Sequence, residues 1–189
     1  MVTTGDDVGP NGPIAFLGPE WEVGADGVRF RQAARVLLVD ESDRVLLVHG
    51  SDVDQRERTW WFTVGGGLEP GEDPRDGAVR ELVEETGIAI SPDTLLGPVF
   101  RRDALFDFFR ETCRQDELFF LARYRPSGDA PAFSRAGWTE IEHETIDELR
   151  WWDLDDLAAV DEEVFPVGLP ELVRGLLAGW DGVTRRLDG

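Results

Sequence analysis

The segment from Gly66 to Ile88, GGLEPGEDPRDGAVRELVEETGI, constrains the fold of this chain most, because it places a glycine-rich loop directly before a short acidic helix. Asp73 predicts the N-cap of that helix, Pro74 fits its first position, and Gly87 predicts its end. Glycines let a backbone turn tightly and approach a ligand closely. The loop contains four of them: Gly65, Gly66, Gly67 and Gly71.

The predicted helix carries three glutamates, Glu81, Glu84 and Glu85, at positions that share one helical face. The opposite side carries the apolar residues Ala78, Val79, Leu82 and Val83, so we expect it to pack on a sheet while the acids face outward. Carboxylates about 5 Å apart repel by roughly 3 kcal/mol at an effective dielectric of 20, and a bound cation relieves this repulsion. Oxygen ligands suit Mg²⁺, or Mn²⁺, better than zinc. For the glutamates alone, a solvated face of an amphipathic helix is the simpler alternative.

The spacing of the whole segment resembles the signature of the Nudix hydrolases, G-x5-E-x7-R-E-U-x-E-E-x-G-U, in which U is a bulky aliphatic residue. Every fixed position is filled, by Gly66, Glu72, Arg80, Glu81, Leu82, Glu84, Glu85, Gly87 and Ile88. Weaker similarity extends from about residue 30 to about residue 157. The resemblance implies an α/β fold, the Nudix-type α/β/α sandwich with a mixed β-sheet.

The resemblance also implies a metal-dependent hydrolase that cleaves the pyrophosphate bond of a nucleoside diphosphate linked to another group, by attack of water on phosphorus. Glu81, Glu84 and Glu85 would bind the metal together with the Gly65 carbonyl, and Arg80 and Glu72 would hold these carboxylates in place. A non-catalytic module that binds or senses a nucleotide is the alternative, although such a module has no need for every ligand.

Nudix enzymes often use one more acid from outside the signature, and the sequence does not choose among its candidates. These are Glu111, Asp116, Glu117, Glu140, Glu142 and Glu144.

The rest of the chain predicts one domain over residues 13–189, preceded by a disordered N-terminus over residues 1–12. Residues 13–28 predict an N-terminal arm, either short strands or a lid. The distribution of apolar and turn-forming residues predicts a set of strands and two further helices. The strands are residues 30–39, 45–48, 60–64, 99–110, 117–124 and 146–152, with a polar turn at 111–116, and the helices are 155–160 and 169–180.

Three residues outside the signature are candidates for substrate binding. Arg101 and Arg102 would bind phosphate, and Trp61 would stack on a base. A half-buried sheet with a charged outer face is the alternative interpretation of the same strands. His49 and His143 are interpreted as surface or packing residues rather than catalytic ones. The single cysteine, Cys113, excludes an internal disulfide.

The charge of the chain bears on its partners. Its formal net charge is −20, and all 19 of its basic residues are arginines. Such a surface repels polymeric nucleic acid and anionic membranes, although a small nucleotide can enter together with its metal. No stretch has the pattern of a membrane span or a secretory signal, so we expect a cytoplasmic protein, with a homodimer left open.

Overall fold

A computed structural model of the protein describes residues 20–52, 55–108, 111–125 and 133–188. The N-terminal segment predicted to be disordered lies outside these residues. The strands are β1 (Glu22–Val23), β2 (Arg29–Val39), β3 (Val45–Ser51), β4 (Thr59–Gly67), β5 (Leu96–Phe108), β6 (Glu111–Arg123), β7 (Ile146–Trp152), β8 (Glu163–Phe165) and β9 (Arg185–Leu187). The helices are α1 (Pro74–Thr86), α2 (Glu140–Thr145), α3 (Leu154–Ala158), α4 (Leu169–Leu177) and the 3₁₀ turn Pro92–Thr94.

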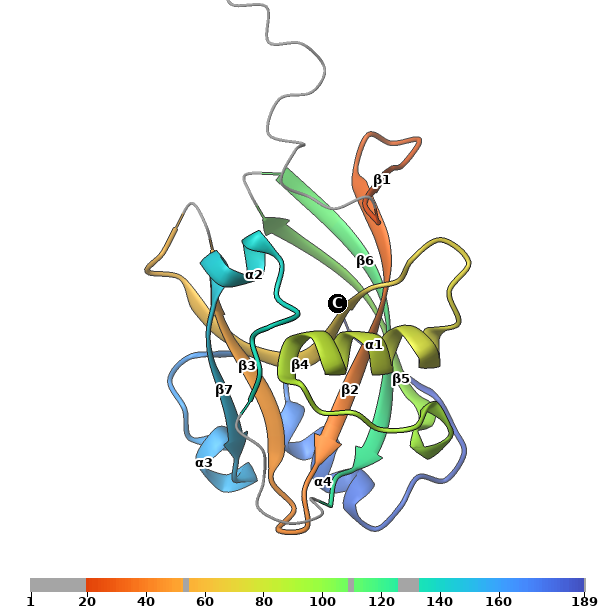
Figure 1. Cartoon of the computed structure of the whole chain (residues 1–189), viewed down its shortest axis with the longest axis vertical. Coiled ribbons are helices and arrows are strands. Elements are labelled where there is room, and N and C mark those ends of the chain that lie inside the picture. Colours follow the sequence, from red (N-terminus) through yellow and green to blue (C-terminus); the bar gives the residue numbers. More distant parts are fainter. Residues whose placement is uncertain (1–19, 53–54, 109–110, 126–132, 189) are drawn as a thin grey trace, which may run out of the picture.

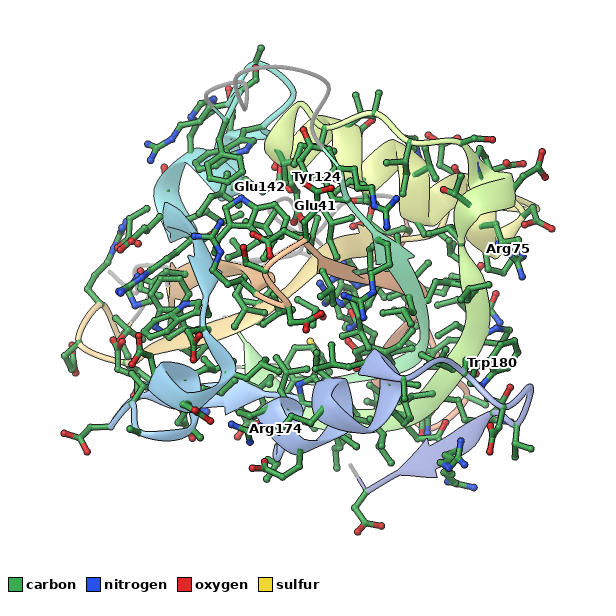
Figure 2. All side chains as sticks on the ribbon, turned by 90° about the horizontal axis from the view of Figure 1, so that it is seen from below. Glu41, Arg75, Tyr124, Glu142, Arg174 and Trp180 are labelled. Carbon is green, nitrogen blue, oxygen red and sulfur yellow. The ribbon has the colours of Figure 1, made fainter. Side chains whose placement is uncertain are left out.

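The strands form one mixed sheet in the order β7-β3-β4-β2-β6-β5-β9, with β1 beside β2 and β8 beside β4. Pairs β2–β6, β4–β8 and β5–β9 are parallel, and the others are antiparallel. Helices α1 and α2 lie on one face, in front of the sheet in Figure 1. Helix α4 lies on the other face, and Figure 2 shows the sheet between α1 above and α4 below. The predicted α/β/α sandwich is confirmed.

Two hydrophobic cores fill the layers on either side of the sheet. One packs alternate residues of β2, such as Val36 and Leu38, against Ala78 and Leu82 of α1. The other packs the intervening residue Leu37 against α4. This alternation follows from the two-residue period of a strand that is covered on both faces. Within the described ranges, no helix has the length and apolarity that crossing a membrane requires.

Strand β4 bends where it leaves one neighbour for another. Its first half, from Thr59 to Thr63, pairs antiparallel with β3, and its second half, from Val64 to Gly67, pairs antiparallel with β2. Strands β2 and β3 are antiparallel to each other, so a straight strand could not be antiparallel to both. The change of direction is helped by Gly65, whose φ of 124° is open mainly to glycine. The bend brings the glycine loop to the middle of the sheet, under α1.

Helix α1 has the ends that the sequence predicts. The Asp73 side chain accepts a hydrogen bond from the Arg75 amide, Pro74 is the first helical residue, and Gly87 ends the helix in the left-handed conformation at φ 78°. The other predicted helices are also present, slightly shorter than expected, with Asp153 as the N-cap of α3.

The prediction of a polar turn over residues 111–116 is wrong, because this segment is the first half of strand β6. Strand β5 runs to Phe108, so the connection between the two strands lies at residues 109–110. The polar residues of β6 alternate with buried ones, among them Cys113 and Gln115, which face the interior. The turn was predicted from the polarity of the segment, but polar residues also occur on the buried side of this strand.

The predicted N-terminal arm contains the short strand β1, which pairs with the start of β2 through Glu22 with Phe30 and Val23 with Arg29. Trp21 lies next to this pairing and is buried, with the Arg31 guanidinium 4.4 Å from the centre of its ring. Residues 20–28 therefore lie along one end of the sheet.

Candidate active site

Three carboxylates from two helices meet beside the bend of β4. One oxygen from each of Glu81, Glu85 and Glu142 lies within 4.8 Å of the others. Glu81 and Glu85 come from α1, and Glu142 comes from α2 on the same side of the sheet, where Figure 2 labels it. All donors are oxygens, which is the chemistry that Mg²⁺ and Mn²⁺ prefer.

The expectation that the helix glutamates face outward is wrong for two of them. Glu81 is 9% exposed and Glu85 is 4% exposed, whereas Val83, expected on the buried side, is 41% exposed. The buried stripe of α1 also contains Gly77, Ala78, Leu82 and Thr86. The helix is therefore turned so that the sheet side includes acids, and apolar periodicity alone could not place it.

Burial of these acids changes their protonation. Burial raises the pKa of Glu81, although hydrogen bonding from Arg80 opposes the shift. Burial raises the pKa of Glu85 well above its ordinary value, and the charge of Glu81 adds to the shift. The pair is therefore poised to take up positive charge, as a proton or as a metal ion.

Two glycines of β4 contact the two buried acids in different ways. The Gly65 amide donates a hydrogen bond of 2.8 Å to Glu85 Oε2. A Cβ atom at Gly66 would lie 2.5 Å from Glu81 Oε2, so any side chain there would displace this carboxylate. Gly66, the first glycine of the signature, is thus explained by the close approach of Glu81 of α1.

Arg80 connects the acids of the loop and the helix. Its Nε and Nη2 donate to the two oxygens of Glu72 at 2.8 and 2.9 Å, and Nη1 donates to Glu81 at 2.8 Å and Glu84 at 2.9 Å. Nη2 also donates to the Gly67 carbonyl at 2.9 Å, so all five N–H groups of the guanidinium have an acceptor. These bonds, those to Glu72 above all, raise the pKa of Arg80 and lower that of Glu72.

Glu84 and Gly65 lie near the site in different ways. The Glu84 carboxylate is bound to Arg80 and is 43% exposed, and it is not a member of the converging group. The Gly65 carbonyl accepts a hydrogen bond from Arg35 Nη1. Metal binding by these two groups stays a prediction.

Glu142 is the candidate from outside the signature that the fold brings to the site. Its Oε2 accepts a hydrogen bond from the Thr139 amide at 2.6 Å, and the Glu142 amide donates to the Thr139 hydroxyl oxygen at 3.3 Å, which together form the capping box of α2. The pattern Thr-x-x-Glu was readable in the sequence as a helix start, but nothing in it indicates that α2 packs near α1.

The remaining acidic candidates lie elsewhere, apart from Glu111, whose side chain is not among the described ones. Glu144 is 3.9 Å from Arg56, Glu140 is exposed, and Asp116 pairs loosely with Arg101 at 3.8 Å. Glu117, 1% exposed, binds Arg35 at 3.1 Å and Arg102 at 2.6 Å. Burial alone would raise the pKa of Glu117, but the charges of the two arginines outweigh it and hold that pKa low.

The predicted substrate-binding residues are not gathered at one place. Arg101 and Arg102 are neighbours in β5 and therefore point to opposite faces of the sheet. Trp61 is 3% exposed in the core with Trp152, and its indole N–H donates to Glu162 at 2.9 Å. Their roles in binding stay predictions, and joint binding of one phosphate by Arg101 and Arg102 does not fit this geometry.

Both histidines make packing contacts. The ring of His143 lies 5.5 Å from the ring of Trp138. His49 binds Asp147 through Nδ1 at 2.5 Å and Glu162 through Nε2 at 3.1 Å. Burial lowers the pKa of His49, but the hydrogen bonds to the two carboxylates outweigh it, so that the pKa is raised overall.

The chain resembles known proteins in both sequence and fold. The family model described as the NUDIX domain matches residues 29–169. An RNA pyrophosphohydrolase of Zymomonas mobilis is 30% identical over 130 residues, which are 61% of this chain and 82% of that protein. A diphosphoinositol polyphosphate phosphohydrolase 3-alpha of Mus musculus is 39% identical over 72 residues, which are 38% of this chain and 42% of that protein. The crystal structure of a MutT protein from Methanosarcina mazei matches with a TM-score of 0.52 and 19% identity over 77% of this chain and 91% of that one, which is a likeness of fold.

Proposed function

This chain belongs to the Nudix family, and we propose that it is a Mg²⁺-dependent hydrolase, with Mn²⁺ as the alternative ion, that cleaves the pyrophosphate bond of a nucleoside diphosphate linked to another group. The observation that carries the proposal is the convergence of Glu81, Glu85 and Glu142 within 4.8 Å. Two of these carboxylates are buried, which is unfavourable unless positive charge joins them.

The acids fit a hard divalent cation. Glu81, Glu85 and Glu142 would hold it, since one oxygen of each lies within 4.8 Å of the others. Such an ion would neutralise the diphosphate and lower the pKa of a bound water.

The other residues of the signature position these ligands. Arg80 fixes Glu81 through one oxygen, Glu72 fixes Arg80 through two, and the Gly65 amide fixes Glu85. With every donor of Arg80 engaged, its function is to orient carboxylates rather than to bind substrate.

We propose that Glu84 is the general base that takes the proton from the attacking water. One of its oxygens accepts from Arg80, whose Nη1 also donates to Glu81 and so holds the two carboxylates side by side. Its 43% exposure gives water access, which the buried Glu81 and Glu85 lack.

A small nucleotide derivative fits the charge of the chain better than a polymer does. The Zymomonas relative is named for RNA, but a formal charge of −20 opposes the approach of a polyanion. A small nucleotide with a bound cation carries little net charge and meets a weaker barrier.

A substrate panel tests the proposal. Nucleotide sugars, ADP-ribose, dinucleoside polyphosphates, oxidised nucleoside triphosphates and an RNA with a 5′-triphosphate are incubated with Mg²⁺, with Mn²⁺ or with EDTA at mildly alkaline pH. We expect metal-dependent release of a nucleoside monophosphate from a small substrate, lost in Glu85→Gln and Glu142→Gln. Hydrolysis that persists fully in both variants, or that EDTA leaves unchanged, contradicts the proposal. Tight binding of a substrate without turnover indicates a sensing module instead.

A further inference from the structure

The segment that precedes α2 is docked on the C-terminal end of α1. The last four C=O groups of an α-helix have no hydrogen-bond partner within the helix. In α1, the Glu85 carbonyl accepts a hydrogen bond of 2.8 Å from the indole N–H of Trp138. The next carbonyl, that of Thr86, accepts one of 3.0 Å from the Ser134 amide. Residues 134–138 therefore satisfy the end of the helix that carries two acids of the cluster.

Gly137 lets this segment lie directly against the backbone of α1. A Cβ atom at Gly137 would lie 2.7 Å from both the Cα atom and the carbonyl oxygen of Glu84. These atoms belong to the helix backbone, so they cannot move aside as the end of a flexible side chain would. Gly137 lies outside the Nudix signature, and the close approach of the two backbones explains why this position has no side chain.

Trp138 is held in one orientation by contacts on its other sides. It is 7% exposed and belongs to the core under α1, together with Leu82 and Ile146. The Arg135 guanidinium lies 4.7 Å from the centre of a ring of Trp138 and donates a hydrogen bond of 2.6 Å to the Asp147 carbonyl in β7. The direction of the indole N–H is therefore fixed before any ion binds.

The same tryptophan is joined to the carboxylate of Glu142 by a short and well-defined piece of chain. Thr139, the next residue, is the N-cap of α2, and its amide donates to Glu142 Oε2 at 2.6 Å. One turn further, the ring of His143 lies 5.5 Å from the ring of Trp138. The place of the Glu142 carboxylate relative to α1 thus depends on where Trp138 is bound.

We propose that Trp138 is a positioning residue of the metal site, because its bond to the Glu85 carbonyl holds α2 where the Glu142 carboxylate meets Glu81 and Glu85. The inference rests on the proposed function, since it concerns the ion that these three acids would bind. Trp138 acts through Glu142 rather than by contact with the ion. Ion binding and the docking of α2 on α1 then favour each other to the same extent, as linkage requires.

The affinity for Mn²⁺, followed by the paramagnetic resonance signal of the free ion, tests this without turnover. Trp138→Phe removes the indole N–H and keeps an aromatic ring, and we expect about tenfold weaker binding. Trp180→Phe is the matched control and should bind as the wild type does. The Trp180 indole also donates to a backbone carbonyl, that of Val183 at 3.0 Å, but it packs on the core of the α4 face (Figure 2).

The Glu142→Gln background separates positioning from a general loss of stability. Glutamine also suits this place in a capping box, so α2 keeps its N-terminus. If Trp138 acts through Glu142, then Trp138→Phe should change the Mn²⁺ affinity of Glu142→Gln by less than about twofold.

Hydrogen exchange gives a second measurement that needs no variant of Trp138. In the wild type, Mg²⁺ should slow exchange of the amides of residues 133–145, the Ser134 amide among them, because the ion joins Glu142 to α1. In Glu142→Gln, Mg²⁺ should leave exchange of this segment unchanged. Gly137→Ala, whose Cβ would push the segment off α1, should speed its exchange and weaken Mn²⁺ binding.

Each result has a defined meaning. Unchanged Mn²⁺ affinity in Trp138→Phe, equal weakening in Trp180→Phe, or an equal effect of Trp138→Phe with and without the Glu142 carboxylate overturns the inference while the proposed function stands. Exchange over residues 133–145 that Mg²⁺ does not slow in a wild type that binds the ion does the same. A wild type that binds neither Mg²⁺ nor Mn²⁺ removes the proposed function and the inference with it.

Discussion

Removing one charge from the buried acid pair should stabilise the metal-free protein, although most substitutions of buried polar groups destabilise. The test is Glu85→Gln, which keeps the size and shape of the side chain. Glu85 is 4% exposed and contacts Glu81 within the converging group. If the two acids bind a cation, their mutual repulsion lowers the stability of the metal-free protein.

The expected magnitude follows from the geometry. Two unit charges at 4.8 Å, the upper limit of the separations within the converging group, repel by about 3 kcal/mol at an effective dielectric near 20. The hydrogen bond from the Gly65 amide changes from a charged acceptor to a neutral one, which costs about 1 kcal/mol. The net gain is about 2 kcal/mol when both acids are ionised, or about 4–8 °C in Tm for a domain of this size. The raised pKa of Glu85 makes the gain smaller at neutral pH, because the proton already relieves part of the repulsion.

Thermal unfolding at pH 9 checks this, once in EDTA and once with excess Mg²⁺. In EDTA, Glu85→Gln should melt above the wild type. With Mg²⁺ the wild type should gain stability by mass action, and the variant should gain little. Asp76→Asn, in an exposed residue of α1, is the control for an equal change in net charge. A variant that melts lower in EDTA, or that responds to Mg²⁺ as the wild type does, would refute the argument.

Further predictions concern the surroundings of the cluster and the stability of the fold. Arg80→Lys should weaken Mg²⁺ binding about 10- to 100-fold, measured by calorimetry, because lysine cannot replace five oriented donors. Gly66→Ala should abolish metal-dependent hydrolysis, because its Cβ would displace the Glu81 carboxylate. Gly175 lies in α4, where an added Cβ would meet nothing within 4 Å. Gly175→Ala should therefore raise the free energy of unfolding by up to about 1 kcal/mol, measured by urea denaturation, and leave activity unchanged. The raised pKa of His49 means that its stabilising contribution is complete below the unfolded pKa near 6.5 and is lost as pH rises through the folded value. Urea midpoints measured from pH 6 to 9 should therefore fall more in the wild type than in His49→Gln.

Local signals in the sequence gave the elements that depend on near neighbours. The ends of α1 follow from Asp73, Pro74 and Gly87, whose effects act within one turn of the helix. Strand β7 was predicted with its observed bounds, residues 146–152, because its aliphatic and aromatic composition is a local property. Strand β6 was missed over residues 111–116 because this segment is polar even on its buried side, where Gln115 accepts a hydrogen bond from Arg31 of β2.

The spacing of the signature, by itself, indicated Glu81, Glu84 and Glu85 as candidate metal ligands, because helix geometry places them within two turns. Only the tertiary structure decided that Glu81 and Glu85 are buried, that Glu84 turns to Arg80, and that Glu142 joins the first two. The physical reason is that helix orientation depends on everything packed against it. The bend of β4 and the missing side chain of Gly66 leave space for buried carboxylates under α1, where an apolar stripe was expected. That space belongs to β4, so the residue pattern of the helix could not predict it.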